Sequence, residues 1–273
     1  MITVQLLGGL GNQLFQYVMA KSLALEKKQQ FSIDISSFKF YKLHHYALDH
    51  FNIEKKVYKK PNRYLKKLIG FFKKTTYYKE KDFHFDPSIF DINESNIYLE
   101  GYFQSEKYFV KYEKEIRKDF EIISPLKKQT QEILQYIEKV NAVSLHIRRG
   151  DYLQHKIHNT DNTDYYKTAM VVMESKVDNP VYFIFSDDMP WVKENFKTNC
   201  ETIFVDCNDA LTNFEDLKLM SACKHNIIVN SSFSWWGAWL NTNKQKIVIA
   251  PQLWYNDNTI NTNDVIPDSW IKI

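Results

Sequence analysis

Short apolar runs alternate with amphipathic segments through the second half of the chain. Residues 126–140 have the spacing of an amphipathic helix, and Ser124-Pro125 before them predicts a helix cap followed by a first-turn proline. The pattern then predicts strands over 142–148, 181–186, 202–205, 226–229 and 246–250, separated by helices near 164–175, 189–197, 212–222 and 234–241. Such alternation is typical of a parallel sheet with helices on both faces, and it predicts an α/β lobe over 125–250.

The first part of the chain begins in the same way and then loses its regularity. Thr3–Leu7 predicts a short buried strand, and Gly8-Gly9-Leu10-Gly11-Asn12 predicts a turn before a helix that extends to about Lys28. Phe31–Ile35 predicts a second strand, whereas 36–96 is basic and aromatic and predicts irregular structure. We expect a first α/β lobe over 1–124, on the acceptor side, and a tail over 251–273 that packs back on the lobes.

Composition and cysteine usage indicate a globular cytoplasmic protein. The chain is 44% hydrophobic and 25% charged, and no apolar run approaches the ~18 residues of a membrane-spanning helix. Met1–Leu7 lacks a basic start followed by a long apolar run, so we expect no secretory signal. Cys200, Cys207 and Cys223 show no C-x-x-C spacing, which argues against a disulfide framework or a zinc site.

Positive charge is concentrated in one stretch although the net charge is only +3. Between Lys55 and Lys81 there are eleven Lys or Arg and a single acid, Glu80. One interpretation of this stretch is the solvated face of a helix. The other is a surface that attracts an anionic membrane or a diphospholipid-linked acceptor. No nucleic-acid recognition motif accompanies the charge, so we expect no nucleic-acid partner.

Polar side chains follow three of the predicted strands. The three groups are His146, Arg148, Arg149 and Asp151; Asp187 and Asp188; and Asn230 to Ser234. Because the carboxyl ends of parallel strands meet at one edge of a sheet, ligands bind there. The sequence therefore predicts a site at this edge.

The block His146-Ile147-Arg148-Arg149-Gly150-Asp151 is suited to phosphate. Strand alternation places His146 and Arg148 on one face and Ile147 and Arg149 on the other. An arginine offers a planar fork of donors to phosphate oxygens and stabilises charge that builds on a diphosphate. The structural alternatives are an ion pair between Arg149 and Asp151 that pins the turn, and a satisfied core histidine at 146.

The segment Asn230–Leu240 predicts a strand end, a hydroxyl-rich turn and a helix start. Free amides at a helix N-terminus bind anions, and Ser231 and Ser232 add hydroxyl donors, although a simple helix cap also fits. Trp235, Trp236 and Trp239 have helical spacing and are more typical of a core than of a sugar platform.

Two further turns carry candidate ligand contacts. The glycines at 8–11 are a weak dinucleotide fingerprint, because Leu14 occupies the third glycine position. Asn12 has two readings, a helix cap and a substrate contact. After Phe185-Ser186, one of Asp187 and Asp188 is a candidate for hydrogen bonds from guanine or ribose, and the other for the cap of the next helix.

Metal-ligand patterns are absent from the sequence. The chain contains no D-x-D triplet and no His/Cys cluster with ligand spacing. If the chain binds a nucleotide-sugar diphosphate, protein cations and amides must replace Mg²⁺ or Mn²⁺, and Arg148 and the turn at 231–233 suit that task.

Together these segments resemble the α-1,2-fucosyltransferase family (glycosyltransferase family 11) of bacteria and animals. The family pattern has a Gly-Gly-Leu-Gly-Asn-Gln start, a His-x-Arg-Arg-Gly-Asp-Tyr block and a late Asn-Ser-Ser-Phe-Ser-Trp-Trp-Gly-Ala-Trp block. This chain has them, in order, at 8–13, 146–152 and 230–239. The resemblance implies a two-lobed GT-B-like architecture with the donor in a carboxyl-terminal Rossmann-like lobe. It also implies metal-independent, inverting transfer of L-fucose from GDP-β-L-fucose to the 2-hydroxyl of a terminal galactoside.

The resemblance also implies roles for the donor-binding residues. Arg148 would grip the β-phosphate, while His146 and one of Asp187 and Asp188 would contact the nucleoside. Asn230, Ser231, Ser232 and Phe233 belong to the block that would hold the diphosphate, as Asn12 belongs to the glycine-rich start.

The general base has more than one candidate. Family members often have a histidine six residues before Asp-Tyr-Tyr, and His158 stands at that distance from Asp164-Tyr165-Tyr166. Asp151, which with Arg149 would shape the cleft near the sugar, is the rival, and a substrate phosphate is a third acceptor for the proton. Other functions stay open: a GDP-sugar transferase of another linkage, and a non-catalytic carbohydrate or lipid-phosphate binding module.

Overall fold

The computed structural model describes residues 1–58, 75–150, 163–257 and 259–273. The chain divides into two compact units. The first comprises Met1–Glu121 with Asn263–Val265, and the second comprises Ile122–Thr262 with Ile266–Ile273. The first unit ends at Glu121, three residues before the boundary expected at 124. Residues Asn263–Val265, which belong to the expected tail, are part of the first unit.

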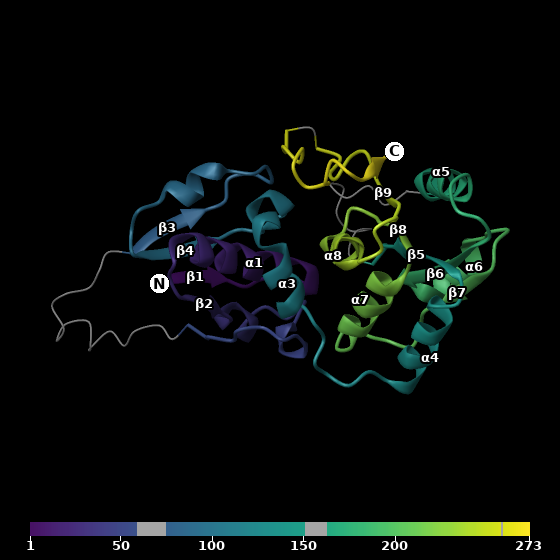
Figure 1. Cartoon of the computed structure of the whole chain (residues 1–273), viewed down its shortest axis with the longest axis horizontal. Coiled ribbons are helices and arrows are strands. Elements are labelled where there is room, and N and C mark those ends of the chain that lie inside the picture. The colour runs from purple at the N-terminus through teal and green to yellow at the C-terminus, as the bar shows by residue number, and fades with distance from the viewer. Residues whose placement is uncertain (59–74, 151–162, 258) are drawn as a thin grey trace. The chain divides into compact units, whose positions relative to one another are not determined.

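The first unit contains a four-stranded parallel sheet in the order β2-β1-β4-β3 (Figure 1). Its strands are β1 (Ile2–Gln5), β2 (Phe31–Asp34), β3 (Thr75–Lys79) and β4 (Asn96–Glu100). Its α-helices are α1 (Leu10–Lys27) and α3 (Glu113–Asp119), and 3₁₀ turns lie at Ser36–Lys39, Leu48–His50, Pro87–Asp91, Glu106–Tyr108 and Val110–Tyr112. Helix α1 packs on β1 through a fully buried apolar face, as the sequence predicts.

The prediction of irregular structure over 36–96 is wrong, because that region contains β3. Strand β3 is the edge of its sheet, and its side chains alternate between exposed and half-buried positions. Its sequence Thr-Thr-Tyr-Tyr-Lys contains residues that favour strands but lacks the alternation of apolar and polar positions on which the prediction relied.

The second unit contains a six-stranded sheet in the order β10-β9-β8-β5-β6-β7, in which every pair is parallel (Figure 1). Its strands are β5 (Asn141–Ile147), β6 (Pro180–Ser186), β7 (Thr202–Phe204), β8 (His225–Ile227), β9 (Val248–Ala250) and β10 (Ile271–Lys272). Its helices are α4 (Lys128–Ile137), α5 (Thr163–Glu174), α6 (Met189–Asn195), α7 (Asn213–Ala222) and α8 (Ser232–Leu240). The predicted alternation of strands and helices is confirmed.

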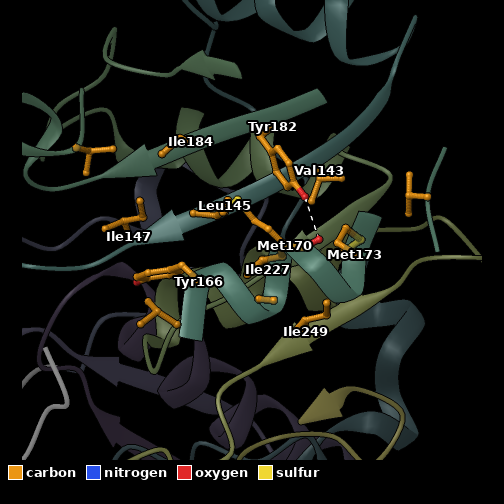
Figure 2. Packing of buried hydrophobic residues seen from close by; sticks show 14 of the residues in the cluster. Val143, Leu145, Ile147, Tyr166, Met170, Met173, Tyr182, Ile184, Ile227 and Ile249 are labelled. Carbon is orange, nitrogen blue, oxygen red and sulfur yellow. Dashed lines mark hydrogen bonds between the residues drawn. The ribbon is translucent and has the colours of Figure 1, made fainter. Parts of the chain in front are cut away.

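Helices cover both faces of this sheet because successive strand residues point to opposite sides. On one face α5 and α6 pack against a cluster that includes Val143, Leu145, Ile147, Tyr166, Met170, Tyr182, Ile184, Ile227 and Ile249 (Figure 2). There the hydroxyl of Tyr182 donates to the Met170 carbonyl at 3.5 Å. On the other face α4 and α7 pack against Ala142, Val181, Phe183 and Phe185.

The tryptophans of α8 are core residues. Trp235 and Trp236 are fully buried, and Trp239 is 4% exposed. Their rings contact one another, and Trp270 joins the group with its ring centroid 5.4 Å from that of Trp235. They fix α8 and therefore the turn that precedes it.

Two predicted helix starts differ from the structure. Helix α4 begins at Lys128 with Lys127 as its N-cap residue, so Ser124-Pro125 is not the cap. Helix α8 begins at Ser232, two residues earlier than predicted, which brings the hydroxyl-rich turn into its first turn. No helix within the described ranges has both the length and the apolar character needed to cross a membrane.

Candidate functional site

The site is built on the carboxyl ends of β5 and β6, which are neighbours in the second sheet. Ile147 pairs with Ser186, so the residues that follow the two strands lie side by side. Arg148 Nε is 3.1 Å from Asp187 Oδ2, with the two side chains 25% and 22% exposed. The backbone N–H of Arg149 donates to Asp187 Oδ1 at 2.9 Å. An ion pair with this much exposure contributes little to stability, so its main effect is to fix the direction of the guanidinium.

Arg149 is held by a different carboxylate. Its Nε lies 3.4 Å from Asp188 Oδ2, and its guanidinium carbon is 3.4 Å from the ring centroid of Trp191. Asp188 is also the N-cap of α6, because its Oδ1 accepts the N–H of Trp191 at 3.4 Å. Of the two aspartates, Asp188 is therefore the helix cap, and Asp187 holds the end of β5.

Gly150 makes room for the Asp187 carboxylate. A Cβ atom at position 150 would lie 2.3 Å from Asp187 Oδ2, closer than any ordinary contact. The glycine between the arginines and Asp151 is thus required by the ion pair itself, at the point where the chain leaves the sheet.

His146 is the penultimate residue of β5, two residues before Arg148, and is 5% exposed. Burial, and then the nearby charge of Arg148, lower its pKa to about 3. Its Nδ1 has no hydrogen-bond partner among the described residues. The lowered pKa favours the neutral imidazole at physiological pH, and a neutral imidazole can hydrogen-bond a ligand.

The start of α8 completes the site. His146 contacts Phe233, with ring centroids 5.9 Å apart, so the first turn of α8 adjoins the end of β5. Ser231 is the N-cap residue, yet its hydroxyl makes no capping hydrogen bond. The first-turn amides of a helix have no intrahelical acceptor, and with Ser231 and Ser232 they form a surface suited to an anion.

Asn230 connects this turn to another segment of the second unit. It is 3% exposed, and its Nδ2 donates to the Trp254 carbonyl at 3.0 Å. The contact ties the end of β8 to the segment that follows β9.

Asn12 belongs to the first unit, whereas the other described site residues belong to the second. Gly9 is the N-cap residue of α1, so the reading of Asn12 as a helix cap is wrong. Its Oδ1 accepts a hydrogen bond from Gln104 Nε2 at 2.8 Å.

Asp151 and His158 lie outside the described residues. Within the described part of the chain, no group of three or more His, Cys, Asp or Glu side chains is placed to hold a metal ion.

Sequence reasoning missed two carboxylates at the start of α7, a helix that also begins at this edge of the sheet. Glu215 is 1% exposed and accepts the N–H of Lys127 at 2.9 Å. Asp216 accepts a hydrogen bond from Asn208 Nδ2 at 2.7 Å, and burial raises its pKa to about 7. Acids in the first turn of a helix are an ordinary helix-start signal, so the sequence does not show that Glu215 is buried.

Two α/β units, each with a parallel sheet, define a GT-B-type glycosyltransferase fold, as the sequence resemblance predicts. The fucosyltransferase NodZ from Bradyrhizobium has this fold, with a TM-score of 0.50 and 13% identity over 86% of this chain and 91% of its own. FUT1 from Arabidopsis thaliana, solved as a variant in complex with GDP, has a TM-score of 0.50 and 10% identity over 99% of this chain and 75% of its own.

The sequence comparisons place the chain more narrowly. The family model for glycosyl transferase family 11 matches residues 1–273. An alpha-1,2-colitosyltransferase of Escherichia coli is 34% identical over 100% of this chain and 98% of its own length. The O-antigen biosynthesis glycosyltransferase WbnK of the same organism is 33% identical over 97% and 98%. Human galactoside alpha-(1,2)-fucosyltransferase 1 is 26% identical over 55% of this chain and 44% of its own. The chain is a glycosyltransferase and belongs to glycosyl transferase family 11.

Proposed function

We propose that the enzyme transfers a deoxysugar from its GDP derivative to the 2-hydroxyl of a terminal galactoside, with inversion and without a metal ion. The α-1,2 linkage in the names of the Escherichia coli and human relatives supports the choice of hydroxyl. The acceptor is a glycan, and the O-antigen relative supports a lipid-linked bacterial polysaccharide precursor. Such an acceptor would bring the enzyme to the cytoplasmic face of the membrane.

Two donors fit this proposal. GDP-fucose follows from the sequence resemblance, and GDP-colitose is favoured by the full-length relative named for colitose. Colitose is fucose without its 3-hydroxyl, so the leaving group and the reacting carbon are the same for both.

The observation that carries the proposal is that Arg148, paired with Asp187, follows the end of β5 where His146 contacts Phe233 of α8. When the bond from the anomeric carbon to the β-phosphate breaks, its electron pair goes to a phosphate oxygen. A fixed guanidinium and the free amides at the start of α8 stabilise that charge. The galactose O2 attacks from the opposite side of the sugar ring, and its proton passes to a base.

Burial and the charge of Arg148 lower the pKa of His146, which makes it a weak acceptor for that proton. Asp151 and His158 remain the candidates, with a substrate phosphate as the alternative acceptor. A His158→Ala variant with an unchanged pH–rate profile would remove His158 from the mechanism.

The test of function is transfer from GDP-fucose and GDP-colitose to β-galactosides, with and without EDTA. We expect chelator-resistant transfer and an α-1,2 product identified by NMR. Product with another linkage would support the alternative transferase. GDP binding without transfer or hydrolysis would support a non-catalytic module. Activity abolished by EDTA and restored by Mn²⁺ would refute the metal-free mechanism.

Arg148 provides the first specific prediction. Arg148→Ala should lower kcat by about 10²–10³, as the loss of a comparable preorganised donor does, because leaving-group charge would go unstabilised. Arg148→Lys should restore only part of the rate, since an ammonium lacks the planar fork. Steady-state kinetics on variants with wild-type Tm would check this, and near-normal transfer by Arg148→Ala would contradict the assignment.

A further inference from the structure

A pocket of about 310 Å³ lies at the carboxyl edge of the first sheet. It is lined by residues at or just after the ends of three neighbouring strands: Gln5 from β1, Glu80 to Phe83 after β3, and Gly101 and Tyr102 after β4. The carboxyl edge is where open parallel sheets bind ligands. The volume is at the lower end of small-molecule sites, about 300–1,000 Å³.

Two aromatic rings are among the groups that line the pocket. Phe83 and Tyr102 are stacked, with ring centroids 6.1 Å apart and planes 7° from parallel. A flat apolar ring beside polar groups suits a ligand with one apolar face and several hydroxyls, as a pyranose has.

The backbone at Tyr102 is held in place by the half-buried carboxylate of Glu80. Glu80 accepts the backbone N–H groups of Tyr102 and Phe103 at 2.6 and 2.9 Å. Phe103 has φ 55°, a left-handed conformation that is rare for a bulky side chain. A Cβ atom at Gly101 would lie 2.4 Å from Glu80 Cβ, so only glycine lets the two segments approach. Strain of this kind, fixed by surrounding contacts, is typical of ligand sites.

The charges of the pocket favour a neutral ligand. Its lining has three acids and two lysines, and Lys79 already pairs with Glu100 at 3.2 Å. This balance offers no excess of cations for a phosphate, unlike the arginine pair and helix start of the second unit. Carboxylate and amide groups such as those of Asp82 and Gln5 are suitable hydrogen-bond partners for sugar hydroxyls.

We propose that this pocket binds a neutral sugar ring of the acceptor glycan. The ring packs on Phe83 and Tyr102, and its hydroxyls donate to Asp82 and Gln5. Glu80 is a positioning residue that sets the Tyr102 backbone. The identification of the sugar as acceptor rests on the proposed transferase function, whereas binding of a neutral saccharide does not.

The test measures saccharide and GDP binding separately. Lactose and methyl β-galactoside are titrated by ligand-observed NMR into the wild-type protein, Phe83→Ala and Asp82→Asn. Asp82→Asn keeps an oxygen for the Phe83 N–H that Asp82 accepts at 2.8 Å. Tyr77→Ala is the matched control, because Tyr77 is an aromatic residue of β3 that is 75% exposed and does not line the pocket.

We expect Phe83→Ala and Asp82→Asn to weaken saccharide binding at least about tenfold, equivalent to about 1.4 kcal/mol, with Tyr77→Ala and all GDP affinities unchanged. Glu80→Gln should raise the KM for the galactoside and leave kcat unchanged. Saccharide binding that is unaffected by Phe83→Ala and Asp82→Asn, or absent from the wild-type protein, would overturn the inference. Failure to bind GDP would instead refute the proposed function, and the saccharide titration would still decide the pocket.

Discussion

The orientation of the Arg148 guanidinium depends on two neighbouring residues, Asp187 and Gly150. Asp187 pairs with its guanidinium and also accepts the backbone N–H of Arg149, so one carboxylate fixes both the side chain and the chain direction after β5. Gly150 leaves the space that this carboxylate occupies. The arrangement makes the orientation of Arg148 sensitive to changes that leave the core untouched.

Gly150→Ala should therefore lower activity without unfolding the protein. The new Cβ would meet the end of the Asp187 side chain at 2.3 Å, and a flexible carboxylate can move away. We expect a free energy of unfolding within about 0.5 kcal/mol of wild type. The kcat/KM for the GDP-sugar should fall by tenfold or more, since a misplacement of about 1 Å costs up to about 10²-fold. Asp187→Asn should give the same kinetic loss; unchanged kinetics in both variants would refute the positioning role.

His146 should make the protein acid-sensitive. In the unfolded chain a histidine binds a proton near its ordinary pKa of about 6.5, whereas folded His146 does so only near pH 3. The unfolded state thus holds more protons between these values, and stability falls as pH falls, by up to about 1.4 kcal/mol per pH unit from this residue. Urea unfolding of wild type and His146→Gln at pH 7 and pH 5 would measure it. The variant should lose less stability on acidification, and equal losses would contradict the burial argument.

At the scale of elements, apolar patterning determined what could be predicted. Strands β5 and β6 are buried on both faces and are rich in apolar residues, with Ser144 and His146 as the polar positions inside β5, so their positions were predicted to within one residue. Strand β3 was missed, because an edge strand with exposed tyrosine has no such run.

The arrangement of site residues was only partly predictable. Topology indicated that residues after neighbouring strands would meet, and the contact between His146 and Phe233 fits this. The Arg148–Asp187 pair depends on strand register, which neither strand's own sequence specifies. The pocket of the first unit depends on β3 and on the Gly101–Phe103 turn, neither of which shows an apolar pattern that places it in a sheet.

Helices α7 and α8 pack closely at Gly237. A Cβ atom there would lie 2.8 Å from Met220 Cβ, an atom fixed by the α7 backbone. Alanine favours a helix by about 1 kcal/mol over glycine, whereas overpacking a core costs about 1–3 kcal/mol. We expect the steric cost to win in Gly237→Ala, with a lower Tm by calorimetry. An unchanged or higher Tm would mean that the helices separate at little cost.

At the scale of the whole molecule, the chain spans nearly the full length of its Escherichia coli relatives, and each of its two units has a polar carboxyl edge. The edges differ in chemistry. The second presents arginines and a helix start, which suit a diphosphate, whereas the first presents stacked aromatic rings and a mixed-charge pocket, which suit a neutral sugar.

This difference predicts that the two substrates protect different units against amide exchange. A ligand stabilises what it binds, by about 2.7 kcal/mol at 100 times its Kd, and exchange by local opening slows accordingly. Saturating GDP should therefore protect 146–150, 187–188 and 231–234, while lactose should protect 80–83 and 101–102. Hydrogen exchange followed by mass spectrometry resolves these segments. The control is a peptide from β3 that contains the exposed Tyr77. Its exchange rate should be the same with either ligand, except for any part that includes residue 80. Protection of 80–83 by GDP alone would place the nucleotide in the first unit. The arginine pair would then need another role, because a leaving diphosphate must lie against the cation that stabilises it.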